Sequence, residues 1–384
     1  MATDGDNYET VVKAPRAETV AEFHEKVTLI GRLQHALHVT PALVPLVVLL
    51  LSIAVFGILL GGQFFSPGSQ SLILQQVQIV GIVAAAQTLV ILTAGIDLSV
   101  GAIMVLTSVI MGQFTFRYEL PVEVAILCGF IAGGAIGYLN GWLIAVMKLP
   151  PFIVTLGTWQ IILATNYLYS ANETIRSQDI RENAPMLQWL GAKPNTQIVE
   201  SVERMQGIVH EGRRPADTGS WFLDTLWSVN ITYGVVVMVV LIAVLAWVLR
   251  HTAWGRHVYA VGDDPEAAQL AGVNVRGTLI SVYVMSGLIC ALAGWALIGR
   301  IGSVSPTSGV DANIESITAV VIGGISLFGG RGSIMGALFG ALIVGVFSLG
   351  LRMMGADAQW TYFLIGVLII AAVAVDQWIR KAVA

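Results

Sequence analysis

The stretch Arg250–Gly277 reads RHTAWGRHVYAVGDDPEAAQLAGVNVRG, and it is the main polar interruption in the C-terminal half of an apolar chain. Its centre carries the start signal of a short helix. The carboxylate of Asp263 or Asp264 can accept hydrogen bonds from the exposed backbone N–H groups of a first turn. Pro265 suits the first helical position, where no backbone N–H is needed. The stretch therefore predicts a helix that begins at Pro265 inside a polar loop.

The same loop also carries a stop signal. Glu266 stands where the helix dipole favours a negative charge, and Gly272 can end the helix in a left-handed conformation. The predicted helix, Pro265–Ala271, is about two turns long. Such a capped helix offers a contact to a second protein, and the small side chains of Ala267 and Ala268 would allow that protein to approach closely.

The composition indicates a membrane protein. Of the 384 residues, 56% are hydrophobic and 11% are charged, whereas soluble domains have about 25% charged residues. The 41 glycines are typical of closely packed membrane helices. The net charge of −4, without a basic cluster, gives no reason to expect nucleic-acid binding. Cys128 and Cys290 lie in apolar segments and are predicted to be small core residues, and no metal site is predicted.

Ten apolar segments follow the hydrophilic N-terminus, and each is a candidate membrane helix. A bilayer core of about 30 Å needs roughly 20 helical residues. The third and eighth segments are short, so either can be a broken or re-entrant helix whose irregular backbone is buried in protein. We predict an all-α polytopic membrane protein with about ten transmembrane helices. The segments are Leu43–Leu60, Leu72–Ala94, Leu98–Phe114, Val122–Met147, Phe152–Tyr169, Val229–Leu249, Leu279–Ile298, Ile314–Phe328, Ile334–Leu351 and Trp360–Val375.

The lysines and arginines predict how the chain is oriented. With the N-terminus inside, eleven of the 20 lie on the inner side, three lie in short outer loops and six lie in one long outer loop. Positive residues are enriched in cytoplasmic loops. Both termini and the loop at 250–277 are therefore predicted to be cytoplasmic.

The predicted organisation has one membrane domain and two cytoplasmic tails. In the N-terminal tail, apolar residues recur at helical spacing from Val20 to Leu37, which is typical of an interfacial helix; a disordered tail is the alternative. The parts are a tail at 1–40, a transmembrane domain at 41–378 with a long periplasmic loop at 170–228 and the cytoplasmic loop at 250–277, and a second tail at 379–384.

Five motifs occur in order along the chain and carry a resemblance to a known family. They are Gly95-Ile96-Asp97-Leu98-Ser99-Val100-Gly101, Gly141-Trp142-Leu143-Ile144-Ala145, Leu149-Pro150-Pro151-Phe152-Ile153-Val154-Thr155-Leu156-Gly157-Thr158, the EAA-x-x-x-G pattern of Glu266–Gly272, and Gly323-Gly324-Ile325-Ser326-Leu327-Phe328-Gly329-Gly330-Arg331-Gly332-Ser333. Together they resemble the permease subunits of bacterial monosaccharide ABC importers, the branch of the ribose, xylose and fructose systems. The resemblance runs from about Leu43 to Val375, and the overall pattern is most similar to fructose permeases.

This resemblance implies a fold, partners and a function. It implies the ABC importer permease fold of ten helices, a homodimer in the bacterial inner membrane, contact with membrane lipid, and a periplasmic sugar-binding protein that delivers a monosaccharide, with fructose favoured and ribose or xylose possible. It also implies a partner ABC ATP-binding subunit that holds ATP-Mg, while this chain binds no cofactor. The loop at 250–277 is then the coupling loop that docks into the ATPase. The residues that match the coupling motif and its cap are Asp264, Pro265, Glu266, Ala267, Ala268 and Gly272.

Other motif residues can be interpreted from their own chemistry. Asp97, which shares its motif with Gly101, is either a helix cap or a buried polar anchor near the coupling loop. Gly329, Gly330 and Arg331 are predicted to form a tight cytoplasmic turn whose arginine reaches lipid headgroups. This turn is no phosphate loop, because no strand precedes it and no lysine of the chain follows a glycine. The chain is therefore predicted to be a transport subunit without enzymatic activity.

The spacing of four glycines predicts a close helix contact. Gly129, Gly133, Gly137 and Gly141 are four residues apart and would share one helix face, where another helix can approach closely.

An uncharged sugar needs hydrogen-bonding side chains and an aromatic face along its path. The candidates are Asn140, Thr155, Trp159, Gln160 and Glu315. Glu315 begins the eighth segment on the outer side, and capping that helix is its alternative role. For the polar candidates, an interhelical hydrogen bond is the alternative explanation.

An ion-coupled secondary transporter of a small polar solute is the alternative function. Such carriers usually hold ionisable groups near the membrane midplane. The acids Asp97, Glu315 and Asp376 all lie at segment ends instead, which favours the ATP-driven importer.

Overall fold

The computed structural model of the protein describes residues 42–193, 231–309 and 311–381, which fall within one unit from Thr40 to Ala384. The predicted tail helix between Val20 and Leu37 and most of the predicted outer loop at 170–228 lie outside the described residues. Regular structure in the described part is helical, apart from one antiparallel bridge between Ile175 and Val304.

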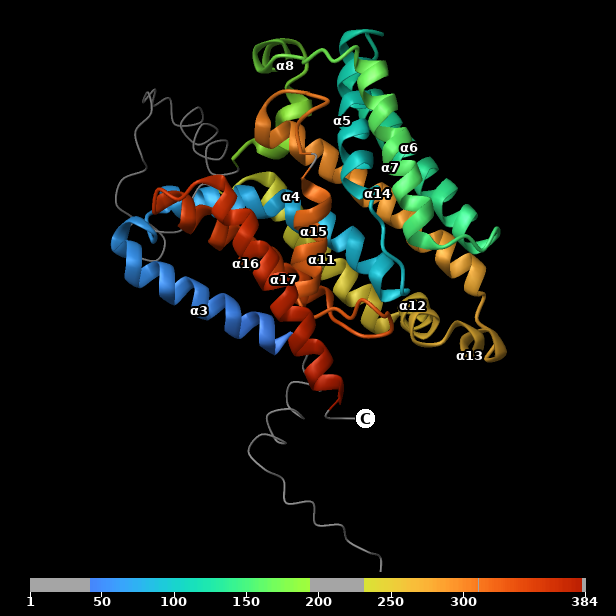
Figure 1. Ribbon diagram of the computed structural model, residues 1–384. Coiled ribbons are helices and arrows are strands. Elements are labelled where there is room, and N and C mark those ends of the chain that lie inside the picture. The colour runs from blue at the N-terminus through green and yellow to red at the C-terminus, as the bar shows by residue number, and fades with distance from the viewer. Residues whose placement is uncertain (1–41, 194–230, 310, 382–384) are drawn as a thin grey trace, which may run out of the picture. The chain divides into compact units, whose positions relative to one another are not determined.

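Each of the ten predicted apolar segments contains one helix (Figure 1). These helices are α3 (Leu43–Leu60), α4 (Pro67–Leu92), α5 (Val100–Phe116), α6 (Val122–Ala145), α7 (Pro151–Ser170), α11 (Tyr233–His251), α14 (Val275–Ile301), α15 (Ala312–Ile322), α16 (Ile334–Met353) and α17 (Ala358–Lys381). Shorter helices connect them: η1 (Gly61–Gln63), α8 (Ser177–Asn183), η2 (Pro185–Gly191), α12 (Ala253–Asp263) and α13 (Pro265–Leu270).

Six helices in the described part are long and apolar enough to cross a bilayer, namely α3 with η1, α4, α6, α11, α14 and α16. The apolar helices α5 and α15 and the apolar part of α17 are shorter. The chain is therefore a polytopic, helical membrane protein, as the composition predicts.

Helix α15 covers only the first part of its apolar segment, which continues to Phe328. It ends at Ile322, and Gly324 then adopts a φ of 74°, which a residue with a side chain adopts only at a cost. With 11 residues, the helix rises about 16 Å, roughly half of a bilayer core. The eighth segment is thus interrupted, one of the two possibilities that its short length leaves open.

Helix α4 occupies the centre of the bundle. Every residue from Val77 to Leu92 is buried, and the helix packs against α11, α14, α15 and α16. A helix that is apolar on all sides is stable only when other helices surround it. By contrast, many large apolar residues of α3 are exposed, as expected for a helix that faces lipid.

The predicted glycine face of α6 is confirmed as a close contact, and its main partner is α14. A Cβ atom added at Gly137 would lie 2.2 Å from the carbonyl oxygen of Tyr283, and one at Gly133 would lie 2.5 Å from that of Gly287. Gly129 instead faces Met111 of α5. Figure 1 shows α5 and α6 beside each other, and α14 packs against both.

The described beginning of the outer loop is folded onto the end of α14. Leu187 and Leu190 of η2 are fully buried, and a Cβ at Gly191 would lie 1.8 Å from the carbonyl oxygen of Gly299. The Gln188 amide donates a hydrogen bond to the Gly302 carbonyl at 2.6 Å. This part of the predicted outer loop is therefore packed onto the helix bundle.

Candidate functional site

The helix predicted to begin at Pro265 forms in the loop between α11 and α14, and a second helix, α12, which is not predicted, precedes it. Helix α13 starts at Pro265, and the Asp264 carboxylate accepts hydrogen bonds from the N–H groups of Glu266 at 2.9 Å and Ala267 at 3.0 Å. At the other end, Gly272 has a φ of +85° and its N–H donates to the Gln269 carbonyl at 3.0 Å. Asp264 is therefore the cap, while Asp263 ends the preceding helix α12.

The sequence suggests that Ala267 and Ala268 both face a partner protein, but only Ala267 is exposed on α13. Ala268 is only 5% exposed and packs inside the chain, so its small size serves an internal contact. Glu266 and Ala267 are exposed. Leu270 is 91% exposed, so its side chain is available to a partner, although a single exposed leucine does not by itself mark an interface. The docking role of this helix stays a prediction, and Leu270 joins its candidate residues.

Three chain segments meet by backbone contact behind this loop. A Cβ added at Gly262, near the end of α12, would lie 1.8 Å from the Leu92 carbonyl oxygen and 2.7 Å from the Gly330 nitrogen. The Gly330 N–H donates a hydrogen bond to that same Leu92 carbonyl at 3.0 Å. We call Gly262, Leu92 and Gly330 the backbone junction. It joins α12 to the end of α4 and to the turn before α16.

The turn before α16 is tight, as predicted. Gly329 and Gly330 have φ values of 82° and 68°, and Arg331 is exposed. The Tyr259 hydroxyl of α12 donates a hydrogen bond to the Gly332 carbonyl at 2.9 Å, and burial raises the pKa of this tyrosine. The loop at 250–277 is thus fastened to the turn at two places, both of them on α12.

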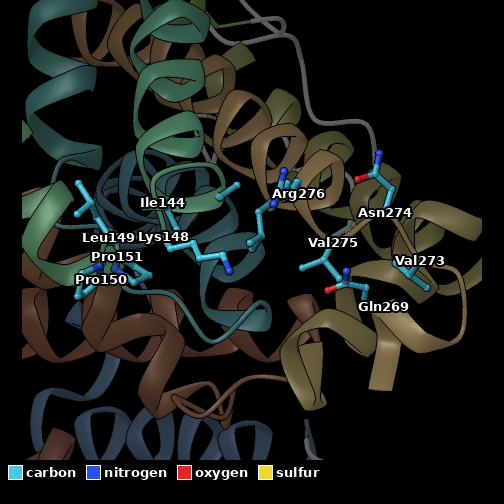
Figure 2. Close-up of a pocket in the computed structure, with 12 residues that line it drawn as sticks. Ile144, Lys148, Leu149, Pro150, Pro151, Gln269, Val273, Asn274, Val275 and Arg276 are labelled. Carbon is cyan, nitrogen blue, oxygen red and sulfur yellow. The ribbon is translucent and has the colours of Figure 1, made fainter. Parts of the chain in front are cut away.

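A groove of about 580 Å³ lies beside α13 (Figure 2). One wall is the turn between α6 and α7, and the other is the segment that links α13 to α14. Lys148 and Arg276 are the charged residues among those that line it, which are Ile144, Ala145, Lys148, Leu149, Pro150, Pro151, Gln269, Val273, Asn274, Val275, Arg276 and Leu279.

Asp97 lies in a buried turn between α4 and α5. Its carboxylate accepts hydrogen bonds from the Ser99 N–H at 2.7 Å and the Ser99 hydroxyl at 2.6 Å. Ser99 itself is the cap residue of α5, so Asp97 stabilises the turn before the helix and is not its cap. Burial raises the pKa of Asp97 from 3.8 to about 6, although the Ser99 hydrogen bonds act in the opposite direction. The structure thus favours the buried anchor over the helix cap.

Residues from three other helices hold this turn in place. The Asn140 amide of α6 donates to the Ser99 hydroxyl at 3.0 Å, and the Thr155 hydroxyl of α7 donates to the Ile96 carbonyl at 3.0 Å. Asn313 of α15 accepts a hydrogen bond from the Gly101 N–H and donates to the Leu98 carbonyl. A Cβ at Gly101 would lie 2.5 Å from the Asn313 side-chain oxygen, so only glycine allows this contact.

Two polar atoms beside the turn are buried without a hydrogen-bond partner among the described residues. They are the Asn140 side-chain oxygen and the Tyr283 hydroxyl. Unpaired buried groups are costly, so this cluster is a place where a rearrangement can gain hydrogen bonds.

The predicted sugar-path residues do not converge on one cavity. Asn140 and Thr155 are fully buried at the Asp97 turn, whereas Gln160 is exposed on α7. Trp159 borders a void of about 10 Å³, far too small for a sugar. Glu315 lies in the first turn of α15, where no side-chain cap hydrogen bond forms. Their role in a sugar path stays a prediction.

Comparison with known proteins places these features in a family. The family model described as "Branched-chain amino acid transport system / permease component" matches residues 70–373. The chain is 66% identical over 375 residues to the fructose import permease protein FrcC of Rhizobium meliloti, covering 97% of this chain and 96% of that protein. No solved structure gives a significant match.

More distant relatives act on other sugars. The chain is 33% identical to the ribose import permease protein RbsC of Escherichia coli K12, over 86% of this chain and 92% of that protein. It is 32% identical to the xylose transport system permease protein XylH of the same strain, over 83% and 87%. The resemblance to monosaccharide ABC importer permeases is therefore confirmed. Because the family model covers residues 70–373, from α4 into α17 and including the loop at 250–277, the chain belongs to this family of transport-system permease components.

Proposed function

We propose that the chain is the membrane-spanning subunit of an ATP-driven importer that carries fructose across a bacterial inner membrane. The observation that carries this proposal is the 66% identity to a fructose import permease over 97% of the chain. Identity to the ribose permease is half as high, which favours fructose over the other two sugars.

The proposal includes partners that the chain must recognise. We infer a partner ATPase that holds ATP-Mg, a periplasmic binding protein that delivers the sugar, and a second copy of this chain. The exposed α13 is capped at both ends and directly follows α12, which is hydrogen-bonded to the turn before α16; this arrangement supports a seat for the ATPase. An exposed leucine and a buried alanine on α13 fit a helix that inserts its tip into a groove.

We also propose ten membrane passages with both termini in the cytoplasm. The ten apolar helices and the uneven distribution of lysine and arginine support this topology. Single cysteines placed at Ala253 for the inside and Ser177 for the outside test it. An impermeant thiol reagent should label Ser177→Cys but not Ala253→Cys in intact cells. The opposite pattern would reverse the orientation.

Transport in reconstituted vesicles tests the sugar and the energy source together. The permease is assembled with its ATPase and with the binding protein, and the uptake of labelled fructose, ribose and xylose is compared. We expect ATP-dependent uptake that is fastest for fructose and unaffected when ion gradients are collapsed. Uptake that needs an ion gradient and no ATPase would refute the proposal. A preference for ribose or xylose would correct the sugar alone.

A further inference from the structure

The groove beside α13 has a charge pattern that calls for an anionic ligand. The exposed Lys148 and Arg276 stand on its two walls, and no acidic residue lines it. Neither side chain makes an ion pair or a hydrogen bond within the described part of the chain. In Figure 2, Lys148 extends into the space between the two walls. Its volume of about 580 Å³ falls in the usual range for ligand pockets, about 300–1,000 Å³.

Lys148 lies in the short connection between α6 and α7. Lys148 has a φ of 56°, in the left-handed region where glycine is the favourable residue at a helix end. The adjacent hydrogen bond from the Leu149 N–H to the Leu143 carbonyl closes this helix end. This left-handed turn ends α6 beside the groove that Lys148 lines.

The groove lies where three apolar helices end. Helix α6 ends at Ala145, α7 begins at Pro151 and α14 begins at Val275, and all three residues or their neighbours line the groove. The 24 residues of α6 and 27 residues of α14 rise about 36–40 Å, which exceeds a hydrocarbon core of about 30 Å. Their ends therefore reach the level of the lipid headgroups.

Exposed apolar side chains continue from the groove along the membrane face. Leu149 and Pro150 line the groove, and the exposed Phe152 and Ile153 follow on the first turn of α7. An anionic group in the groove could thus carry an acyl chain against α7. Basic pockets between membrane helices on the cytoplasmic side are typical sites for anionic lipid headgroups.

We propose that the Lys148–Arg276 groove binds the headgroup of an anionic phospholipid of the cytoplasmic leaflet, with its acyl chain against Phe152 and Ile153. Because the groove shares Gln269 and Val273 with the coupling loop, a bound lipid braces α13 against the α6–α7 turn. This site would make the position of the coupling loop depend on the anionic lipid content of the membrane.

The test uses the purified full chain in detergent and follows its thermal unfolding. Short-chain phosphatidylglycerol, short-chain phosphatidylcholine and inorganic phosphate are titrated separately. A ligand that binds only the folded state stabilises it by RT ln(1 + [L]/Kd), so the melting temperature rises with the logarithm of the ligand concentration once this exceeds Kd. We expect such a rise with phosphatidylglycerol and none with the other two.

The variants are chosen so that loss of binding is separate from loss of folding. Lys148→Gly suits the left-handed backbone, so it should fold at least as well as the parent, and it is combined with Arg276→Gln. Removing two cations should weaken phosphatidylglycerol binding roughly 25-fold, about fivefold for each charge. Arg250→Gln removes an exposed cation outside the groove and should bind as the parent does.

Three results would overturn the proposal. One is an equal response to phosphatidylcholine, which would show that only the apolar face binds. Another is a response to inorganic phosphate alone, which would make the groove a site for a free anion. The third is loss of ATPase assembly by the double variant in detergent without anionic lipid, which would assign the groove to the ATPase seat.

Discussion

The α6–α14 contact and helix α13 are both built on small residues, yet they use them in opposite ways. At Gly133 and Gly137, the missing side chains let two backbones touch inside the bundle. At α13, Ala268 faces inward while Leu270 is left exposed. Small residues in the first region complete a contact within the chain. In the second region they hold a helix in place so that another side chain can be presented outward.

Replacing Gly137 by leucine should have the largest effect. The added Cβ would lie 2.2 Å from the Tyr283 carbonyl oxygen, and a backbone atom in a packed helix cannot move aside. We expect several-fold less folded protein, measured by fluorescence-detected size-exclusion chromatography. Gly157→Leu is the matched control, because nothing lies within 4 Å of a Cβ there. Equal amounts of the two variants would show that α6 and α14 tolerate separation.

Leu270→Arg and Ala268→Arg separate the outer and inner faces of α13. Both should abolish the stimulation of ATP hydrolysis by sugar-loaded binding protein. Only Ala268→Arg should also lower thermal stability, since it forces a long cation into a position that is 5% exposed. Limited proteolysis of the loop at 250–277 gives a second readout. Normal stimulation in Leu270→Arg would mean that the partner does not use this leucine.

Gly272→Pro tests whether ATPase coupling needs the C-terminal cap of α13 as much as it needs the exposed Leu270. Gly272 has a φ of +85° and donates its N–H to Gln269. Proline permits neither feature. The variant should stay in the membrane and lose ATPase coupling, while Gly157→Pro on α7 should instead reduce the amount of folded protein. Retained coupling in Gly272→Pro would show that the cap is dispensable.

Asp97→Asn asks whether the buried turn tolerates the loss of its charge. The native pKa of about 6 lies above the unfolded value of 3.8, so the folded state binds the proton more tightly and loses stability as pH rises between these values. Asparagine keeps an acceptor for Ser99 without the buried charge. The variant should melt higher than the parent at pH 8, with a gap that narrows toward pH 5. A lower melting temperature at pH 8 would reveal a partner that stabilises the carboxylate.

Two substitutions at the N-terminal end of α13 should give the smallest effects. Asp264→Ala removes the acceptor for two N–H groups and should cost about 1 kcal/mol of local stability. Glu266→Gln changes an exposed charge near the helix dipole and should cost at most about 0.3–1 kcal/mol. Hydrogen exchange of the loop amides ranks the two. A larger effect from Glu266→Gln would indicate a charged contact at this position.

The sequence predicts those parts of the fold that depend on neighbouring residues. A helix in each predicted apolar segment follows from hydropathy, and the α13 cap follows from Asp264 and Pro265, which act on the next few peptide groups. The apolar segment predicts a helix up to Phe328, but α15 ends at Ile322. The backbone of Gly323 and Gly324 ends the helix there, whereas the apolar residues continue beyond it.

Features that join distant segments could not be predicted. Asn313 forms hydrogen bonds to Gly101 and Leu98, which lie more than 200 residues earlier in the sequence. The sequence around an isolated asparagine does not indicate which residues it will contact. The buried face of Ala268 and the groove between Lys148 and Arg276 likewise exist only after α6, α13 and α14 are packed. Only the lysine after α6, at a helix end where glycine is common, could have drawn attention earlier.

The contact between α6 and α14 also constrains how the protein is made. Gly137 of α6 contacts Tyr283 of α14, and the two residues are far apart in the sequence. Helix α6 is therefore synthesised well before α14. At about 5–20 residues per second, the delay is roughly 7–30 s. During that interval, the bare glycine face of the nascent α6 needs a temporary occupant, either lipid or the insertion machinery. A chain that stops before α14 would keep that occupant and become a substrate for quality-control proteases.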